Sequence, residues 1–214
     1  MGLDVILAGV GGQGILSIAF VLDSAALEAG FLFKQAEVHG MSQRGGAVQS
    51  HLRLARGAIH SDLIPDGRVD LVLAVEPLEA LRYVQALAPG GAVVAAADPF
   101  VNIPDYPDLS GILARVAALP GHVLVPAASL ARRAGSPRAE NMVMLGAAAW
   151  LYPFPDELCL RFVARMFEPK GARVVELNQR AFRLGQAASA LYRTGREAGR
   201  PWAELLREAE GAEG

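Results

Sequence analysis

The 214-residue sequence has a single cysteine, Cys159. An internal disulfide needs two cysteines, and an iron–sulfur cluster held by one chain needs about four thiolates, so this chain alone supplies neither. It has no run of about 18 uninterrupted apolar residues, so we expect no membrane-spanning helix. Residues 1–30 lack the basic segment that opens a secretory signal peptide. We therefore expect a cytoplasmic protein.

The chain also lacks a large excess of either positive or negative charge. The chain has 20 Lys and Arg against 22 Asp and Glu, a net charge of -2, with no basic run. Nucleic acid is therefore not expected as a partner. Apolar residues make up 52% of the chain, enough for the core of one α/β domain with a small helical appendage. The apolar excess reflects small-residue packing, a face buried against a partner, or both.

Continuous apolar runs between glycine turns predict strands buried on both faces of a mostly parallel sheet. The first run, at 3–8, leads through a glycine cluster into a helix at 15–29 and a strand at 31–38, a β-turn-α-β opening. Apolar and polar residues alternate at 47–55, which indicates an antiparallel strand exposed on one face, with 58–64 as its hairpin partner. The remaining expected elements are a helix at 78–88 and strands at 69–77, 92–99 and 122–127.

From residue 138 onward the pattern predicts mainly helices. They are expected at 138–152, 155–167 and 172–194. Residues 207–214 are predicted to be frayed or disordered, and Val101–Ser110 is predicted to be a proline-rich loop. The fold class is therefore α/β and Rossmann-like, with a mostly parallel sheet flanked by helices and a helical C-terminal part.

Gly9, Gly11 and Gly14 satisfy G-x-G-x-x-G between a strand and a helix, the setting of a dinucleotide fingerprint. Backbone N–H groups at the helix N-terminus would face a pyrophosphate there. The candidate phosphate contacts are Gly11, Gly12, Gln13 and Gly14.

Three interpretations of this turn stay open. It packs a helix against a strand, it contacts an anion or cofactor phosphate, or it forms an NAD or FAD site. Gln13 places a bulky amide where a phosphate would lie close. Glu37, about 23 residues beyond Gly14, would take the ribose hydroxyl of a dinucleotide.

A polar stretch, "EVHGMSQRGGAVQSH", runs from Glu37 to His51. His39 and His51 are twelve residues apart with no third ligand at a metal-binding spacing, so no metal site is expected. Ser42 and Ser50 lack the G-x-S-x-G setting of a serine nucleophile. We therefore predict no catalytic residue in this stretch.

Arg44 precedes Gly45 and Gly46 in the same stretch. A guanidinium on a glycine-rich loop can bind a carboxylate or phosphate through two parallel hydrogen bonds. An ion pair with Glu37 or with a partner subunit is the alternative.

Four strings together resemble a known family: "GVGGQGILS", "AEVHGMSQRGGAVQSHLRL", "ENMVMLGA" at Glu140–Ala147 and "NQRAFRLG" at Asn178–Gly185. They resemble the gamma-type domain of the 2-oxoacid:ferredoxin oxidoreductases over about residues 3–186. The string E-x-H-G-M-S-Q-R-G-G is typical of the branch that acts on indolepyruvate. The resemblance implies a gamma-type domain at 1–186. Residues 187–214 carry no string of the family, and their sequence predicts a helical, partly disordered tail.

Enzymes of that family decarboxylate a 2-oxoacid oxidatively, join the acyl group to coenzyme A and pass electrons to ferredoxin. The resemblance implies that thiamine diphosphate, Mg²⁺ and iron–sulfur clusters lie mainly on a large catalytic partner subunit, and that this chain holds none of them. It would be the subunit without cofactors, inactive alone, in a complex acting on an arylpyruvate such as indolepyruvate.

The same resemblance places a substrate- or partner-facing loop near coenzyme A and assigns Asn141 to the site. The loop residues are Glu37, His39, Gly40, Met41, Ser42, Gln43, Arg44, Gly45 and Gly46. Two other classes of function stay open. One is a stand-alone dinucleotide-binding oxidoreductase that uses the Gly9–Gly14 turn, and the other is a self-associating binding or scaffold protein.

Overall fold

The computed structural model describes residues 2–39, 45–101 and 103–212, with Val38 and His39 described by their backbone alone. The strands are β1 (Gly2–Val10), β2 (Leu32–His39), β3 (Ala47–Ala55), β4 (Val69–Ala74), β5 (Leu87–Ala96) and β6 (His122–Val125). They form one sheet in the order β2-β3-β1-β4-β5-β6. The predicted α/β fold with a helical C-terminal part is confirmed.

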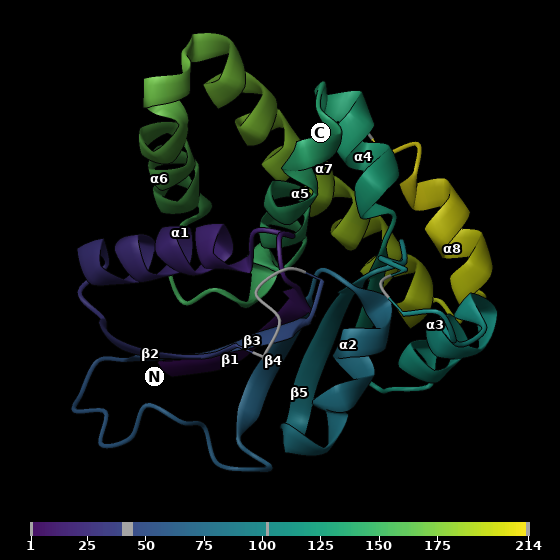
Figure 1. Ribbon diagram of the computed structural model, residues 1–214, viewed down its shortest axis with the longest axis horizontal. Coiled ribbons are helices and arrows are strands. Elements are labelled where there is room, and N and C mark those ends of the chain that lie inside the picture. The colour runs from purple at the N-terminus through teal and green to yellow at the C-terminus, as the bar shows by residue number, and fades with distance from the viewer. Residues whose placement is uncertain (1, 40–44, 102, 213–214) are drawn as a thin grey trace.

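The helices are α1 (Ile15–Glu28), α2 (Pro77–Arg82), α3 (Leu109–Ala117), α4 (Ala127–Ala134), α5 (Glu140–Ala147), α6 (Asp156–Phe167), α7 (Ala172–Glu197) and α8 (Trp202–Ala209). Short 3₁₀ turns lie at η1 (Val84–Ala86), η2 (Pro137–Ala139), η3 (Ala149–Leu151) and η4 (Glu168–Lys170). Helices α1, α5 and α7 cover one face of the sheet, and α2 and α3 cover the other (Figure 1).

Five of the six strands run in one direction, and β3 alone runs against them. The pairs β1–β4, β4–β5 and β5–β6 are parallel. Strand β3 pairs antiparallel with β1 on one side and with β2 on the other. Its side chains alternate between buried and half-buried, as the sequence alternation predicted. The central strands β1 and β4 are buried on both faces, with Leu7 and Leu73 fully inaccessible.

The predicted hairpin partner at 58–64 is wrong, because both edges of β3 are already occupied by β1 and β2. That segment is a loop of bends and turns. Side chains of β3 hold it in place. Arg53 Nη1 donates to the carbonyl oxygens of Ser61 and Leu63 at 3.2 and 3.3 Å, and the Ile64 N–H donates to His51 Nδ1 at 3.2 Å.

Two helices were not predicted, and two predicted helices are shorter than expected. Helices α3 and α4 follow β5 and β6, where the sequence analysis expected only a loop and a strand. The helix expected at 78–88 ends at Arg82, and β5 already begins at Leu87. The helix expected at 138–152 is a 3₁₀ turn, then α5, then a second 3₁₀ turn.

Helices α5 and α7 pack backbone against backbone. A Cβ atom on Gly146 would lie 1.9 Å from the carbonyl oxygen of Phe182, and one on Gly185 would lie 1.9 Å from that of Val143. Gly146 is the next-to-last residue of the "ENMVMLGA" string, and Gly185 is the last residue of the "NQRAFRLG" string. The two strings therefore encode a close helix–helix crossing.

The C-terminal segment is better ordered than its composition predicted. Helix α8 packs against α7, with Leu205 and Ala209 buried, and Ala212 is buried beyond the helix. The expected fraying from residue 207 is therefore wrong for the described part of the tail. The division at residue 186 stays a prediction, and α7 runs across that position. Of the helices that the structure describes, none combines the length and apolar character needed to span a bilayer.

Candidate functional site at the glycine turn

The glycine turn lies at the point where the sheet topology reverses. From β1 the chain passes through α1 to one side of the sheet, and from β4 it passes through α2 to the other side. Ligands of open α/β sheets bind outside the carboxyl ends of strands at such a point. A groove of about 390 Å³ lies here, lined by Gly12, Gln13, Val75, Phe100, Pro137, Arg138, Glu140 and Asn141.

Three separately predicted motifs meet at this turn. The Gly11 N–H donates to the Gly46 carbonyl oxygen at 2.9 Å, and the Gly45 N–H donates to the Gly11 carbonyl oxygen at 3.4 Å. Asn141 Nδ2 donates to the Gly14 carbonyl oxygen at 3.3 Å. The glycine turn, Gly45 and Gly46 of the polar stretch, and the start of α5 therefore form one site.

Gly14 fixes the geometry at the start of α1. It is the N-cap residue, with φ of 79°, and as a glycine it has no side chain to cap the helix. A Cβ atom there would lie 2.5 Å from Asn141 Nδ2. Asn141 is buried, and its Oδ1 accepts from the Met142 N–H at 3.0 Å. Asn141 thus stabilises the glycine turn through its hydrogen bond to Gly14. A direct contact between Asn141 and a ligand stays a prediction.

The Gln13 side chain joins the backbone at the carboxyl ends of β1 and β4. Its Oε1 accepts from the Val10 N–H at 2.8 Å, and its Nε2 donates to the Val75 carbonyl oxygen at 3.0 Å. Both ends of the amide are therefore engaged. The sequence identified this side chain as an obstacle in the turn, and the structure shows that it bridges β1 to the end of β4.

Glu37 does not approach the glycine turn as a ribose ligand would. Because β3 lies between β2 and β1, β2 is two strand spacings away, roughly 10 Å across the sheet. Gln35 Nε2 donates to Glu37 Oε1 at 3.0 Å and to Ser50 Oγ at 3.1 Å. In a dinucleotide-binding unit the second strand lies beside the first, so this placement counts against a ribose contact.

Part of the predicted loop lies outside the described residues. This holds for Gly40, Met41, Ser42, Gln43 and Arg44, and for the side chain of His39. Their assignment to a substrate or partner stays a prediction. Gly45 and Gly46 are the members of the loop that the structure places at the glycine turn.

The sequence analysis missed a buried carboxylate beside this site. Glu76, 1% exposed, lies two residues beyond the end of β4 and caps α2, its Oε2 accepting from the Glu79 N–H at 2.8 Å. The Tyr106 hydroxyl donates to Glu76 Oε1, and burial together with this bond raises the pKa of Tyr106. The sequence did contain a signal for the capping role of Glu76, because Pro77 follows it. Proline is common at the first position of a helix, and the residue before it often caps the helix with a side-chain oxygen.

The groove has mixed charge. Among the described residues that line it, Arg138 is the one cation. Burial, reinforced by the charge of Asp98, raises the pKa of Glu140. Burial also raises the pKa of Asp98, whose Oδ2 accepts from the Ala128 N–H at 2.9 Å. An anion bound here would therefore depend on Arg138 and on backbone N–H groups at the start of α1.

The chain's own residues do not fit an iron–sulfur cluster. Cys159 is buried within α6, and burial raises the pKa of its thiol, which disfavours the thiolate that binds metal. Across the described ranges, no three His, Cys, Asp or Glu side chains gather in a way that could hold a metal ion.

The doubly wound sheet, with its glycine turn at the switch point, defines a Rossmann-like domain, and comparison identifies its kind. The model of the pyruvate ferredoxin/flavodoxin oxidoreductase family matches residues 4–188. The chain belongs to this family, and the resemblance found in the sequence is confirmed.

The chain is also similar to particular members of this family. It is 37% identical to the indolepyruvate oxidoreductase subunit IorB of Methanothermobacter thermautotrophicus over 197 residues, 89% of this chain and 99% of that protein. The fold is similar to that of a 2-oxoglutarate:ferredoxin oxidoreductase from Magnetococcus marinus, with a TM-score of 0.71 and 23% identity. That match covers 88% of this chain and 31% of that one.

A separate gamma subunit shares the fold as well. The keto/oxoacid ferredoxin oxidoreductase gamma subunit of Geobacter sulfurreducens matches with a TM-score of 0.64 and 23% identity, covering 88% of this chain and 98% of that one. The same fold therefore occurs both as a separate chain and as about a third of a longer chain.

Proposed function

We propose that this chain is the subunit without cofactors of a thiamine-diphosphate-dependent 2-oxoacid:ferredoxin oxidoreductase. The complex would decarboxylate an arylpyruvate such as indolepyruvate, form the acyl-CoA and reduce ferredoxin. The similarity over 99% of an indolepyruvate oxidoreductase subunit carries this proposal. The partner is a large catalytic subunit that holds thiamine diphosphate, Mg²⁺ and the iron–sulfur clusters, and the complex is cytoplasmic.

In this proposal, the groove beside the glycine turn contacts coenzyme A or substrate. Three observations support it. The groove lies at the topological switch point, its residues come from motifs far apart in the chain, and Arg138 and the uncapped start of α1 suit a phosphate. Gly11, Gly12, Gln13 and Gly14 would shape the phosphate end, and Arg138 would add a charge-assisted contact.

Co-purification without oxygen tests the subunit assignment. The tagged chain is expressed with the large subunit from the same organism, and the eluate is examined for stoichiometry, visible spectrum and turnover. A stoichiometric complex with broad iron–sulfur absorbance, active with indolepyruvate and coenzyme A, is expected. A colourless protein that elutes alone or as a homodimer would contradict the proposal and favour a scaffold function.

The contact with coenzyme A is tested by Arg138→Ala in the assembled complex. The apparent KM for coenzyme A should rise about tenfold to a hundredfold, with the KM for the 2-oxoacid little changed, because one charge-assisted bond contributes ~1.5–3 kcal/mol. Arg115→Ala, on α3, is the matched control. Equal KM values in the two variants would remove Arg138 from the site.

A stand-alone dinucleotide-binding oxidoreductase remains the second candidate, because the G-x-G-x-x-G turn does lie between a strand and a helix. The Gln13 bridge and the position of Glu37 count against it. Isothermal titration of the isolated chain with NAD, NADP and FAD tests it directly. Saturable binding of any of these would revive this candidate.

A further inference from the structure

Helix α1 is apolar around almost its whole circumference. Of its 14 residues, only Asp23 and Glu28 are ionisable, and Asp23 is buried. The outward-facing side chains include Leu16, Phe20 and Leu27, which are 46%, 47% and 60% exposed. A helix on a solvated surface normally carries charged and polar residues on its outer face. The outer face of α1 therefore has the composition of a buried surface.

This apolar face opens onto a groove between α1 and α6. One part, of about 440 Å³, is lined by Phe20, Ser24, Leu27, Glu28, Phe162 and Arg165. A larger part, of about 720 Å³, extends between α6 and α7. The two parts share Glu28, Phe162 and Arg165, so they form one continuous depression, the α1–α6 groove.

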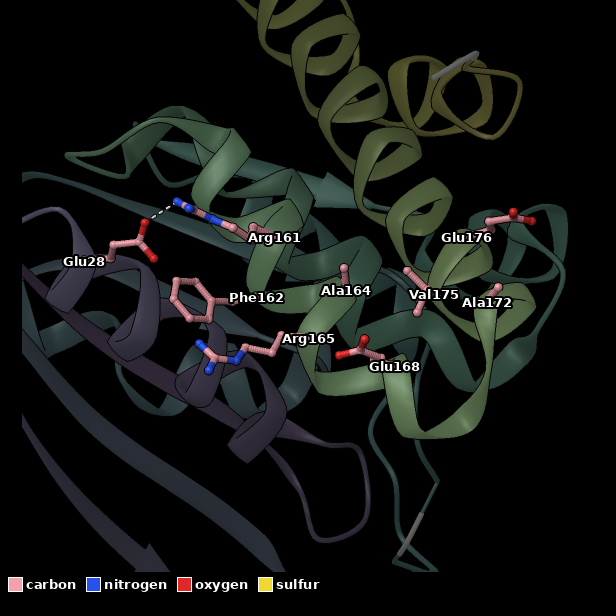
Figure 2. A pocket seen from close by; sticks show the side chains of 9 residues that line it. All are labelled: Glu28, Arg161, Phe162, Ala164, Arg165, Glu168, Ala172, Val175 and Glu176. Carbon is pink, nitrogen blue, oxygen red and sulfur yellow. Dashed lines mark ion pairs between the residues drawn. The ribbon is translucent and has the colours of Figure 1, made fainter.

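The floor of the α1–α6 groove is apolar, and charges stand at its rim. Figure 2 shows Phe162 directed from α6 toward α1, with Ala164 and Val175 farther along, where α6 faces α7. Glu28 and Arg161 form an ion pair across one side. The groove therefore offers an apolar seat between polar edges, the form that accepts the apolar face of an amphipathic helix.

The remaining rim charges specify what such a helix would carry. Arg165 lies beside Phe162, whereas Glu168 and Glu176 lie at the end where α6 turns into α7. Within the described part of the chain, none of these three exposed side chains forms an ion pair. A complementary helix would place an acidic residue opposite Arg165 and a basic residue opposite Glu168 and Glu176.

The position of the groove favours one occupant. Helix α1 begins at Ile15, directly after Gly14 of the glycine turn, so a chain that binds α1 would be held rigidly beside the candidate site. The Magnetococcus relative holds this domain as 31% of a longer chain, so the domain there is continuous with further protein. We propose that an amphipathic helix of the large catalytic subunit lies in the α1–α6 groove. This inference rests on the proposed function.

Site-specific photocrosslinking tests the contact in the assembled complex. The photoreactive amino acid p-benzoyl-phenylalanine is placed at Leu27 and, as a matched control, at Leu63, which is 53% exposed in the loop at 56–68. The Leu27 position should crosslink to the large subunit at least tenfold more than the Leu63 position. The crosslinked peptide should be an amphipathic helix with a basic end.

The outcomes separate the two proposals. If the unmodified chain does not assemble with the large subunit, both proposals fall. If it assembles, but Leu27 crosslinks no better than Leu63 or crosslinks to a second copy of this chain, only the groove assignment falls.

Charge reversal gives an independent test of the same contact. Arg165→Glu should weaken association with the large subunit about tenfold at low salt, and reversing the facing acidic residue on the mapped helix should restore it. Arg115→Glu, on α3, is the control and should associate normally. Equal affinity for Arg165→Glu and Arg115→Glu would overturn the charge assignment.

Discussion

The Gln13 side chain joins the end of β1 to the backbone of Val75, which directly follows β4. One amide thereby satisfies a donor at Val10 and an acceptor at Val75, at 2.8 and 3.0 Å. At a topological switch point the loops after two adjacent parallel strands run to opposite sides and leave an opening for a ligand. In this protein a side chain spans that opening, and a ligand would occupy the groove beside it.

Gln13→Ala should lower the free energy of unfolding by ~1–3 kcal/mol, because it leaves two partly buried backbone groups without partners. Urea denaturation followed by circular dichroism measures the change. Gln85→Ala, at an exposed position in η1, should stay within ~0.5 kcal/mol of the parent. Similar midpoints for the two variants would show that the Gln13 bridge contributes little.

Gly185→Ala should destabilise the protein by ~3 kcal/mol or more, because its Cβ atom would overlap the Val143 carbonyl and force α5 and α7 apart. The control is Gly57→Ala, where a Cβ atom would meet nothing within 4 Å and φ is not positive. Thermal unfolding of both variants measures the difference. A Gly185→Ala protein that melts with the parent would contradict the close crossing described here.

Asp23 should make stability fall as the pH rises. Burial raises the pKa of its carboxyl from 3.8 to about 7, and Oδ1 has no hydrogen-bond partner among the described residues. Between about pH 4 and 7 the folded chain therefore keeps a proton that the unfolded chain has lost. The stabilisation is complete below pH 4 and is lost as the pH rises through 7.

Asp23→Asn removes this titration. Its stability relative to the parent should increase by on the order of 3 kcal/mol between pH 4.5 and pH 8. Urea midpoints at both pH values give this difference, with Asp66→Asn, at an exposed position, as the control. A difference that does not depend on pH would show that folding does not raise the pKa of Asp23.

Tyr106→Phe should loosen the proline-rich segment at 103–108. It removes the hydroxyl that donates to the buried Glu76 carboxylate, a bond to a charged group that typically contributes ~1.5–3 kcal/mol. Amide hydrogen exchange in that segment should quicken about tenfold, whereas Tyr83→Phe should leave it unchanged. Unchanged exchange in Tyr106→Phe would mean that other contacts hold the loop.

The order of elements from β1 to β3 followed from local pattern, but their pairing did not. The apolar run before Gly9 and the alternation from Ala47 to Ala55 each identify a strand in isolation. The insertion of β3 between β1 and β2 depends on contacts about 50 residues apart, which no local period encodes. Because β3 lies between β1 and β2, Glu37 is farther from the glycine turn than the ribose role assumed. For the same reason, β3 has no free edge for the predicted hairpin partner at 58–64.

The candidate site shows the same division. The glycine turn, the polar stretch and Asn141 were each identified from their strings. Their meeting point was not, because Asn141 and Gly14 are 127 residues apart in the chain. Glu76 was missed because a buried carboxylate at a strand end has no spacing rule that marks it, and its partner, Tyr106, lies in a segment predicted only as a loop.

The central position of β1 has a consequence for synthesis of the chain. The first strand to be made pairs with β3, with Gly2 opposite Ala55, and with β4, with Val5 opposite Leu71. At roughly 5–20 residues per second, its first neighbour is not translated until about 3–11 s after it. The apolar strand that will occupy the centre of the sheet is thus synthesised before either of its neighbours. During that interval, its solubility depends on the ribosome and on chaperones.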